Sequence, residues 1–248
     1  MIGKKRRMER LFVGPEKRCL MTPLDHGAWL GPQKGIDNPK DIVTKVLAGG
    51  ANALLVTPGF LKQVESVITP DIGICLRVSI TCGPSPEGKQ EVLAATMETA
   101  LKMDVDAVAL SIFFGRGAEP EMQRTISKYI EEAHRYDMPV LAEMIPAADK
   151  MYDIDAIAHV SRLGMEMGAD IIKTNYAGDP EAYKHVVSSV GLPIIIAGGE
   201  NKGGEEGTLE MIRDIVKAGA HGVAIGRRVW QAEDPEGLVR KMKQELFK

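Results

Sequence analysis

Cysteine is scarce in this sequence, and its spacing argues against a disulfide framework. The 248 residues include three cysteines, Cys19, Cys75 and Cys82, and no two of them form a CxxC pair. We therefore expect a reducing, cytoplasmic environment. Long apolar runs are also missing: none reaches the roughly 18 residues that a membrane span needs. The charged N-terminus has no apolar core of the kind that secretion signals carry, so we expect neither a membrane anchor nor a secreted protein.

No charge of one sign dominates. The formal net charge is -3 and the isoelectric point is about 6.0, which argues against a nucleic-acid partner. The exception is the short basic run 4–7, which we interpret as a solvated first helix turn. Apolar residues make up 44% of the chain, enough for a sizeable core, and the length is typical of one (β/α)8 barrel of about 250 residues.

Short apolar runs alternate with helical stripes along the whole chain. The expected strands cover residues 20–24, 52–57, 72–80, 107–113, 139–145, 169–172, 193–197 and 222–225. Among the expected helices, residues 1–12 form a lid on the barrel floor, and residues 91–103 carry a helical apolar stripe. Asn-Pro, Glu-Pro and Asp-Pro pairs mark helix starts at residues 38, 119, 179 and 234. Residues 81–89, rich in proline and glycine, are predicted to form a loop.

Eight strand–helix pairs in strict alternation predict parallel strands joined by right-handed crossovers. An open doubly wound sheet would usually carry a glycine-rich loop after its first strand. Here the first strand continues into Leu24-Asp25-His26-Gly27. The sequence therefore predicts an α/β fold in which residues 1–248 form a single (β/α)8 TIM-barrel domain with a short N-terminal helix.

The stretch from Ala169 to Asp179 reads ADIIKTNYAGD. Its apolar residues are typical of a short parallel strand with both faces covered. Lys173 follows at the point where the strand should end. Desolvation in an apolar wall lowers the pKa of a lysine amine, and a neutral amine can form an imine with a carbonyl substrate. A surface lysine that closes a strand would look the same in this stretch alone.

In such a barrel the functional residues lie at the C-terminal ends of the strands. Position alone selects Asp25, His26, Ser111, Glu143 and Lys173. The carboxylate of Asp25 could hold a protonated imine or move a proton during carbon–carbon bond cleavage, or it could cap a helix or form an Asx turn. Glu143 could be an acid–base group or an ion-pair partner for Lys173.

Glycines follow the last two expected strands, at Gly198, Gly199 and Gly226, and Arg227 comes next. Phosphate sites in this fold are commonly built from these two loops. Glycine lets backbone amides approach an anion, and Arg227 can add a charge-assisted contact. The alternative is that the glycines only make tight turns. Arg228 is the weaker candidate, because neighbouring residues at a strand end point in opposite directions.

The histidines do not predict a metal site. His134, His159 and His185 fall within expected helices, and His221 lies on the floor side of the last strand. His26 is the histidine at the mouth, whereas a zinc site usually takes three protein ligands. We therefore expect no metal and favour an imine mechanism over a metal-dependent aldol reaction.

These residues resemble a known family over essentially the whole chain. The motifs that carry the resemblance are Leu24-Asp25-His26-Gly27, Gly31-Pro32, Gly49-Gly50-Ala51-Asn52-Ala53, Ile171-Ile172-Lys173-Thr174 with Tyr176, Ala197-Gly198-Gly199 and Val223-Ala224-Ile225-Gly226-Arg227. The sequence is similar to class I aldolases of the DeoC/LacD superfamily, namely the archaeal-type fructose-bisphosphate aldolases. It is more similar to the 2-amino-3,7-dideoxy-D-threo-hept-6-ulosonate synthases, which perform a transaldol-type step early in an aromatic amino-acid route.

The resemblance implies that Lys173 is the Schiff-base lysine and that Asp25 is its acidic partner. It also implies that Gly198, Gly199, Gly226 and Arg227 hold the phosphate of a phosphorylated sugar, and that the protein is a homo-oligomer. No cofactor is expected for an aldol reaction of this kind, because the lysine itself supplies the electron sink.

The sequence departs from the family at the end of the fifth strand. The family's aldolases place a proton-donating tyrosine there, often followed by Pro-Arg-Gly. Here Ile145 takes the place of the tyrosine and Ala147 that of the arginine. Because isoleucine cannot transfer a proton, Glu143, His26 or a bound water would have to do so.

A related branch that cleaves a phosphorylated pentane-dione by thiolytic transfer also lacks the tyrosine. Two alternatives therefore remain beside the aldol reaction. One is acyl transfer from a phosphorylated dione to a thiol cofactor. The other is a non-catalytic barrel that binds a sugar phosphate.

Overall fold

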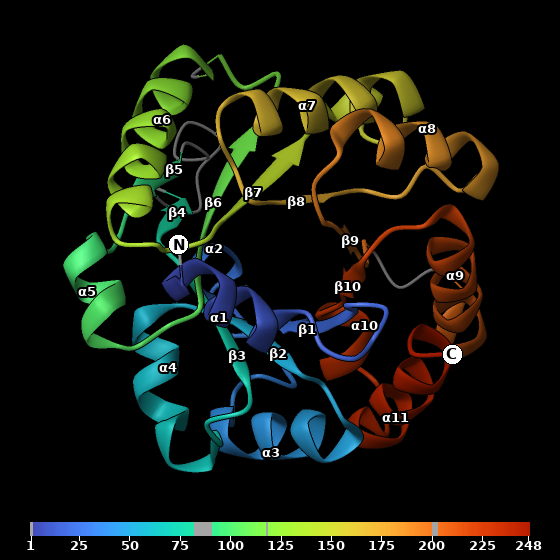
Figure 1. Ribbon diagram of the computed structural model, residues 1–248. Helices are drawn as coiled ribbons and strands as arrows, with labels where there is room; N and C mark the ends of the chain where they lie inside the picture. The colour runs from blue at the N-terminus through green and yellow to red at the C-terminus, as the bar shows by residue number, and fades with distance from the viewer. Residues whose placement is uncertain (1, 82–90, 118, 200–202) are drawn as a thin grey trace.

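The chain folds into a closed barrel of parallel strands surrounded by helices (Figure 1). The structure is a computed structural model, and it describes residues 2–81, 91–117, 119–199 and 203–248. The barrel strands are β1 (Cys19–Pro23), β2 (Ala53–Val56), β3 (Gly73–Arg77), β6 (Ala107–Phe113), β7 (Val140–Ile145), β8 (Ile171–Thr174), β9 (Ile194–Ala197) and β10 (Gly222–Ala224). They pair in the order β1-β10-β9-β8-β7-β6-β3-β2 and close on themselves, which confirms the predicted (β/α)8 architecture.

Helices connect the strands on the outside of the barrel. The long ones are α3 (Pro39–Gly49), α4 (Pro58–Val64), α5 (Met97–Lys102), α6 (Glu119–Arg135), α7 (Ile154–Glu166), α8 (Pro180–Val190), α9 (Gly204–Ala218) and α11 (Pro235–Leu246). Short helical turns lie in the loops: α2 (Gly27–Leu30), η1 (Glu65–Val67), η2 (Ala148–Lys150) and α10 (Arg227–Trp230). None of the helices in the described ranges is both long and apolar enough to cross a membrane.

Local sequence signals account for several helix boundaries. The side chains of Asn38, Asp179 and Asp234 each accept a hydrogen bond from the first turn of the helix that follows, and a proline occupies that turn. This confirms the predicted starts of α3, α8 and α11. Helix α3 ends at Gly49 and is capped by Gly50, whose φ of 99° is a left-handed conformation that glycine adopts without a steric penalty.

The core consists of an outer layer between strands and helices and an inner layer inside the barrel. Every residue of β1, β2 and β3 is buried, as expected for parallel strands covered on both faces. The inner layer includes Cys19, Met21, Leu55, Cys75, Ala109, Leu141, Ile171 and Ile195. The barrel interior is thus filled by side chains, and its open space lies at one end.

Helix α1 (Ile2–Leu11) closes the N-terminal end of the barrel, across the centre of Figure 1. Leu11 is fully buried in the inner layer. Lys4 Nζ donates a hydrogen bond to Asp170 (2.8 Å), directly before β8, and Arg10 pairs with Asp106, directly before β6. Because both acids stand where strands begin, the helix covers the barrel floor, and the predicted lid is confirmed.

The basic run in this helix is not simply solvated, so that prediction is wrong for two of its residues. The side chains of Lys4 and Arg7 are each 18% exposed. Arg7 donates a hydrogen bond to the carbonyl of Val105 (3.2 Å), the residue before Asp106, which pairs with Arg10. These cations anchor the helix to the strand starts.

The structure also corrects the sequence prediction between residues 72 and 103. Strand β3 ends at Arg77, and residues 79–81 form a separate strand, β4 (Ser79–Thr81). It pairs antiparallel with β5 (Glu91–Leu93), so the helix predicted from residue 91 begins instead at Met97. The apolar spacing here fits a helix, but pairing with β4 decides the local structure. Residues 82–90, which include Cys82 and most of the predicted loop, lie outside the described residues.

Candidate active site

All the predicted site residues meet in one cavity at the C-terminal mouth of the barrel. The cavity has a volume of about 430 Å³. Its lining includes Asp25, His26, Ser111, Glu143, Lys173, Gly198, Gly199, Gly226 and Arg227. Strands far apart in the sequence therefore bring these residues together, as the barrel fold predicts.

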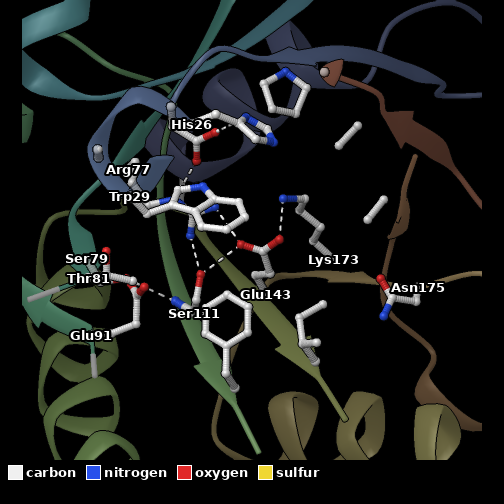
Figure 2. A pocket seen from close by; sticks show the side chains of 18 of the residues that line it. His26, Trp29, Arg77, Ser79, Thr81, Glu91, Ser111, Glu143, Lys173 and Asn175 are labelled. Atoms are coloured by element: carbon white, nitrogen blue, oxygen red, sulfur yellow. Dashed lines mark hydrogen bonds and ion pairs between the residues drawn. The ribbon is translucent and has the colours of Figure 1, made fainter. Parts of the chain in front are cut away.

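Lys173 and Glu143 point toward each other inside this cavity (Figure 2). They are register partners on the neighbouring strands β8 and β7, which places their side chains on the same face. Lys173 is 5% exposed, and its amine donates a hydrogen bond to Glu143 Oε1. The prediction that the amine stands in an apolar wall is therefore wrong, because the carboxylate of Glu143 contacts the amine directly. The predicted Lys173–Glu143 pair is present.

Arg77, at the end of β3, is a central residue of the site that the sequence analysis missed. Its Nε donates to Asp25 Oδ2 (2.8 Å) and its Nη2 to Glu143 Oε2 (2.6 Å). Its Nη1 donates to Ser111 Oγ (2.5 Å), and Ser111 in turn donates to Glu143 Oε2 (2.8 Å). One guanidinium thus joins the ends of four strands. An arginine within an apolar run was the available signal, but the predicted strand continued past it.

The charges in this network fix the protonation states of the two carboxyl groups. Burial raises the pKa of Glu143, but the charges of Lys173 and Arg77 outweigh that effect and lower its pKa to about 2. Burial also raises the pKa of Asp25, but the charge of Arg77 and the adjacent His26 outweigh burial and lower this pKa to well below its usual range. Both carboxyl groups are therefore ionised at neutral pH.

His26 stands at the edge of the cavity beside Asp25. Its Nδ1 lies 3.3 Å from Asp25 Oδ1. Its ring lies 5.9 Å from Trp29 and 5.5 Å, edge to face, from Trp230, measured between centroids. The two indole rings therefore hold the imidazole next to the carboxylate. Trp29 is half exposed and lines the same cavity, so it lies at the mouth.

The glycine loops after β9 and β10 also line the cavity. Gly199 has a φ of 63°, which disfavours a side chain. A Cβ on Gly226 would come within 2.7 Å of the carbonyl oxygen of Pro23, so the backbone there needs glycine. Arg227 lines the cavity, whereas buried Arg228 donates to the carbonyl of Gly198 (2.8 Å) from behind the loop. Both arginines belong to the helical turn α10 and not to a strand end, so the reason given for ranking Arg227 above Arg228 is wrong, although Arg227 is the one that lines this cavity.

The fifth barrel strand ends in apolar groups. Ile145 is buried, lines the cavity and is the register partner of Phe113 on β6. Ala147 lies against the turn at Gly115, where an added Cβ would come within 2.8 Å of the alanine Cβ. No proton-transferring side chain therefore stands at either position. Within the described parts of the chain, no group of three or more histidine, cysteine, aspartate or glutamate side chains is placed to hold a metal ion.

Comparisons with known proteins agree with this geometry. A family model described as DeoC/LacD family aldolase matches residues 19–232. A 2-amino-3,7-dideoxy-D-threo-hept-6-ulosonate synthase of Halobacterium salinarum is 36% identical, over 95% of this chain and 88% of its own. An uncharacterised aldolase of Saccharolobus solfataricus is 33% identical, over 99% of this chain and 95% of its own. The crystal structure of an archaeal fructose 1,6-bisphosphate aldolase has the same fold, with a TM-score of 0.86 at 24% identity over 98% of this chain and 99% of its own.

Proposed function

The chain belongs to the DeoC/LacD family of aldolases, and from this premise we propose that Lys173 forms an imine with the ketone of a phosphorylated sugar. A carbon–carbon bond next to that imine is then made or broken. The observation that carries this proposal is the position of the amine. Lys173 is buried in the mouth cavity and contacts an ionised carboxylate. The two glycine loops line the same cavity.

Imine formation begins with removal of a proton from the amine. Glu143 is the group in position to accept it, because its carboxylate contacts the amine and is ionised at neutral pH. The neutral amine attacks the ketone carbon, and loss of water from the adduct gives a protonated imine. This cation withdraws electrons from the neighbouring bond, so the bond can break and leave an enamine.

Asp25 stabilises the cationic stages of this sequence. Its carboxylate is buried, ionised and held by Arg77 in the same network as Glu143. A fixed negative charge near a developing positive charge acts without the reorganisation that water would need. Arg77 keeps both carboxylates charged and oriented, so the cavity is prepared for a cation on Lys173.

The substrate's phosphate is placed against Gly198, Gly199, Gly226 and Arg227. All four residues line the cavity, the most open of the glycines is Gly199, where an added Cβ would meet nothing closer than 3.6 Å, and Arg227 adds a cation on the cavity side. Barrel order supports this arrangement, because β9 and β10 carry the glycine loops and β9 is the neighbour of β8, which carries Lys173. A phosphate held there leaves the rest of the sugar to extend past Lys173.

We propose a transaldol-type synthase as the form of the reaction. The Halobacterium salinarum relative and a second relative from Archaeoglobus fulgidus, 29% identical over 98% of this chain, are both named 2-amino-3,7-dideoxy-D-threo-hept-6-ulosonate synthase. Fructose-bisphosphate cleavage is the closely related possibility within the same chemistry. The family assignment favours either over thiolytic acyl transfer and over a barrel without catalysis.

Reductive trapping tests the assignment of the lysine. Borohydride added with a panel of ketose phosphates, fructose 1,6-bisphosphate among them, should leave a mass adduct on Lys173 for the true substrate. Lys173→Ala should abolish both adduct and turnover, while Lys184→Ala, an exposed lysine on the following helix, should change neither. An adduct that persists in Lys173→Ala would overturn the assignment. Formation of an acyl thioester, or tight binding without any adduct, would instead support one of the two alternatives.

We also propose that the protein acts in the cytoplasm as a homo-oligomer, at an early step of aromatic amino-acid synthesis. The scarcity of cysteine supports the compartment, and the family resemblance described from the sequence motifs supports the route and the homo-oligomer.

A further inference from the structure

The aldol reaction needs a proton at the aldehyde oxygen, and the groups nearest to the amine are poorly suited to supply it. Asp25 and Glu143 are ionised, because Arg77 and Lys173 hold their pKa values low. Ile145 has no proton to transfer. The proton then comes from His26, from a bound water or from another acid of the cavity that stands some distance along the substrate from the imine nitrogen.

Glu91 lies in the same cavity and belongs to the hairpin that the sequence analysis did not predict. It is the first residue of β5, paired with Thr81 of β4. Glu91 lines the cavity, and Ser79 Oγ donates a hydrogen bond to its Oε2 (2.6 Å). The same Ser79 oxygen accepts a hydrogen bond from the backbone N–H of Ser111 (3.1 Å).

These contacts place Glu91 one side chain away from the charged network rather than inside it. Ser111, which anchors Ser79, donates directly to Glu143, and Glu143 contacts Lys173. Figure 2 shows Glu91 on the far side of Ser111 from Lys173. In an aldol adduct the hydroxyl oxygen is separated from the lysine nitrogen by several bonds. A group that serves this oxygen should therefore stand apart from the amine but in the same cavity.

Glu91 also differs from the other two carboxyl groups in its electrostatics. Burial raises its pKa, and Arg77 and the Ser79 hydrogen bond only partly oppose this, while Glu143 and Asp25 add to it. Arg116, from the loop after β6, also interacts with it electrostatically. Groups in one site whose pKa values are driven apart are the usual acid and base partners of an enzyme. Glu91 is thus a carboxyl group of this cavity whose pKa is raised, so it keeps its proton to a higher pH than Asp25 or Glu143 does.

We propose that Glu91 is the general acid–base residue for the aldehyde oxygen. It would carry out the proton transfer for which this chain has no tyrosine at the end of β7. The inference rests on the proposed function of Lys173. In the direction of synthesis, the enamine carbon attacks the aldehyde carbon as the enamine nitrogen pair forms the imine double bond. The carbonyl π electrons move to the aldehyde oxygen, which takes the proton from Glu91 and becomes a hydroxyl. Glu91 is left as a carboxylate and regains its proton when the reaction runs in the direction of cleavage, or from water.

The test is Glu91→Gln, which keeps the size of the side chain and can keep the Ser79 hydrogen bond. In synthesis, kcat should fall by about 10²- to 10⁴-fold, the usual contribution of a general acid. Because the acid must be protonated, wild-type kcat should fall as pH rises through the pKa of Glu91, and this alkaline limb should disappear in the variant. The borohydride adduct on Lys173 should still form, since imine formation does not need Glu91.

Matched variants separate catalysis from structure. Glu91→Asp keeps a carboxyl group and should retain the alkaline limb at a reduced rate. Glu98→Gln, an exposed residue on α5, should match the wild type. A change in kcat below threefold, or an effect on KM alone, would overturn the assignment in favour of no role or of substrate binding. Loss of the adduct in Glu91→Gln would move its role to imine formation and overturn it too. Absence of an adduct in the wild type would overturn the Lys173 proposal and, with it, this one.

Discussion

Replacing Arg77 with methionine removes the cation that joins the site while keeping a similar aliphatic stem. In the wild type the guanidinium donates to Asp25, Glu143 and Ser111 at 2.5–2.8 Å. All the partners are buried. In Arg77→Met, Glu143 retains Lys173 and Ser111, whereas Asp25 retains His26 as its nearby partner. The variant should therefore fold with an uncompensated buried charge.

The expected loss is large. Removing one member of a buried charge network typically costs about 3–5 kcal/mol of folding free energy, since the remaining charge loses its partner without regaining water. For a chain of this length each kcal/mol lowers the melting temperature by about 2–4 °C. Arg77→Met should then melt roughly 6–20 °C below the wild type.

The pH dependence gives the deeper test. In the wild type the pKa values of Asp25 and Glu143 are lowered on folding, so their contribution is present above the unfolded-state values and is lost as pH falls through the folded-state values. Without Arg77, burial raises the folded-state pKa of at least Asp25. The folded variant then binds a proton more readily than the unfolded chain. Its deficit relative to the wild type should shrink as pH falls from 8 to 5.

Scanning calorimetry at a series of pH values measures both effects. Arg124→Met is the matched control, because Arg124 forms an exposed ion pair with Glu121 on α6, and such pairs contribute little. A melting temperature for Arg77→Met within 2 °C of the wild type would refute the reasoning. So would a deficit that grows on acidification.

Two further predictions concern the phosphate loop and the barrel floor. Arg227→Ala should raise KM for the phosphorylated substrate about ten- to hundredfold and leave kcat nearly unchanged, because the phosphate loses a hydrogen bond to a charged group. A fall in kcat instead, measured by steady-state kinetics, would contradict the phosphate role. Asp170→Asn should lower the free energy of unfolding by about 1–3 kcal/mol in chemical denaturation, because Asp170 accepts hydrogen bonds from Lys4 (2.8 Å) and from the backbone of Val140 (3.0 Å). Asp104→Asn, at an exposed partner of Arg7, should change stability by less than about 0.5 kcal/mol, and an equal loss in both variants would refute the anchoring role of Asp170.

The barrel was predictable because its signals are local and repeated. Residues 107–113 were predicted as a strand and form β6 with the same bounds, and the Asp-Pro and Asn-Pro helix starts mark real caps. The hairpin was not predictable from periodicity. Val92 and Leu93 have helical spacing with Met97, but they are about 40% exposed (41% and 44%) and lie in a strand. Pairing with β4, a tertiary contact, decided their conformation.

The site was partly predictable for a related reason. Asp25 lies two residues after β1, and Lys173 and Glu143 lie in the C-terminal halves of β8 and β7, so the barrel rule brings them together. Arg77 also ends a strand, but the prediction ran β3 and β4 together and placed it in the middle. Glu91 was assigned to a helix on the outside. Both errors come from the short break between β3 and β4. The residues on either side of this break are apolar enough to look like one continuous strand.

The helix across the barrel floor limits how substrates enter and products leave. Along the described parts of the chain, α1 covers the barrel floor, at the end opposite the cavity. Under the proposed function, both halves of the substrate then enter and leave through the mouth, and the ketone half is the one bound to Lys173. The aldehyde half departs before a new aldehyde takes its place, so the two halves of the substrate exchange in sequence.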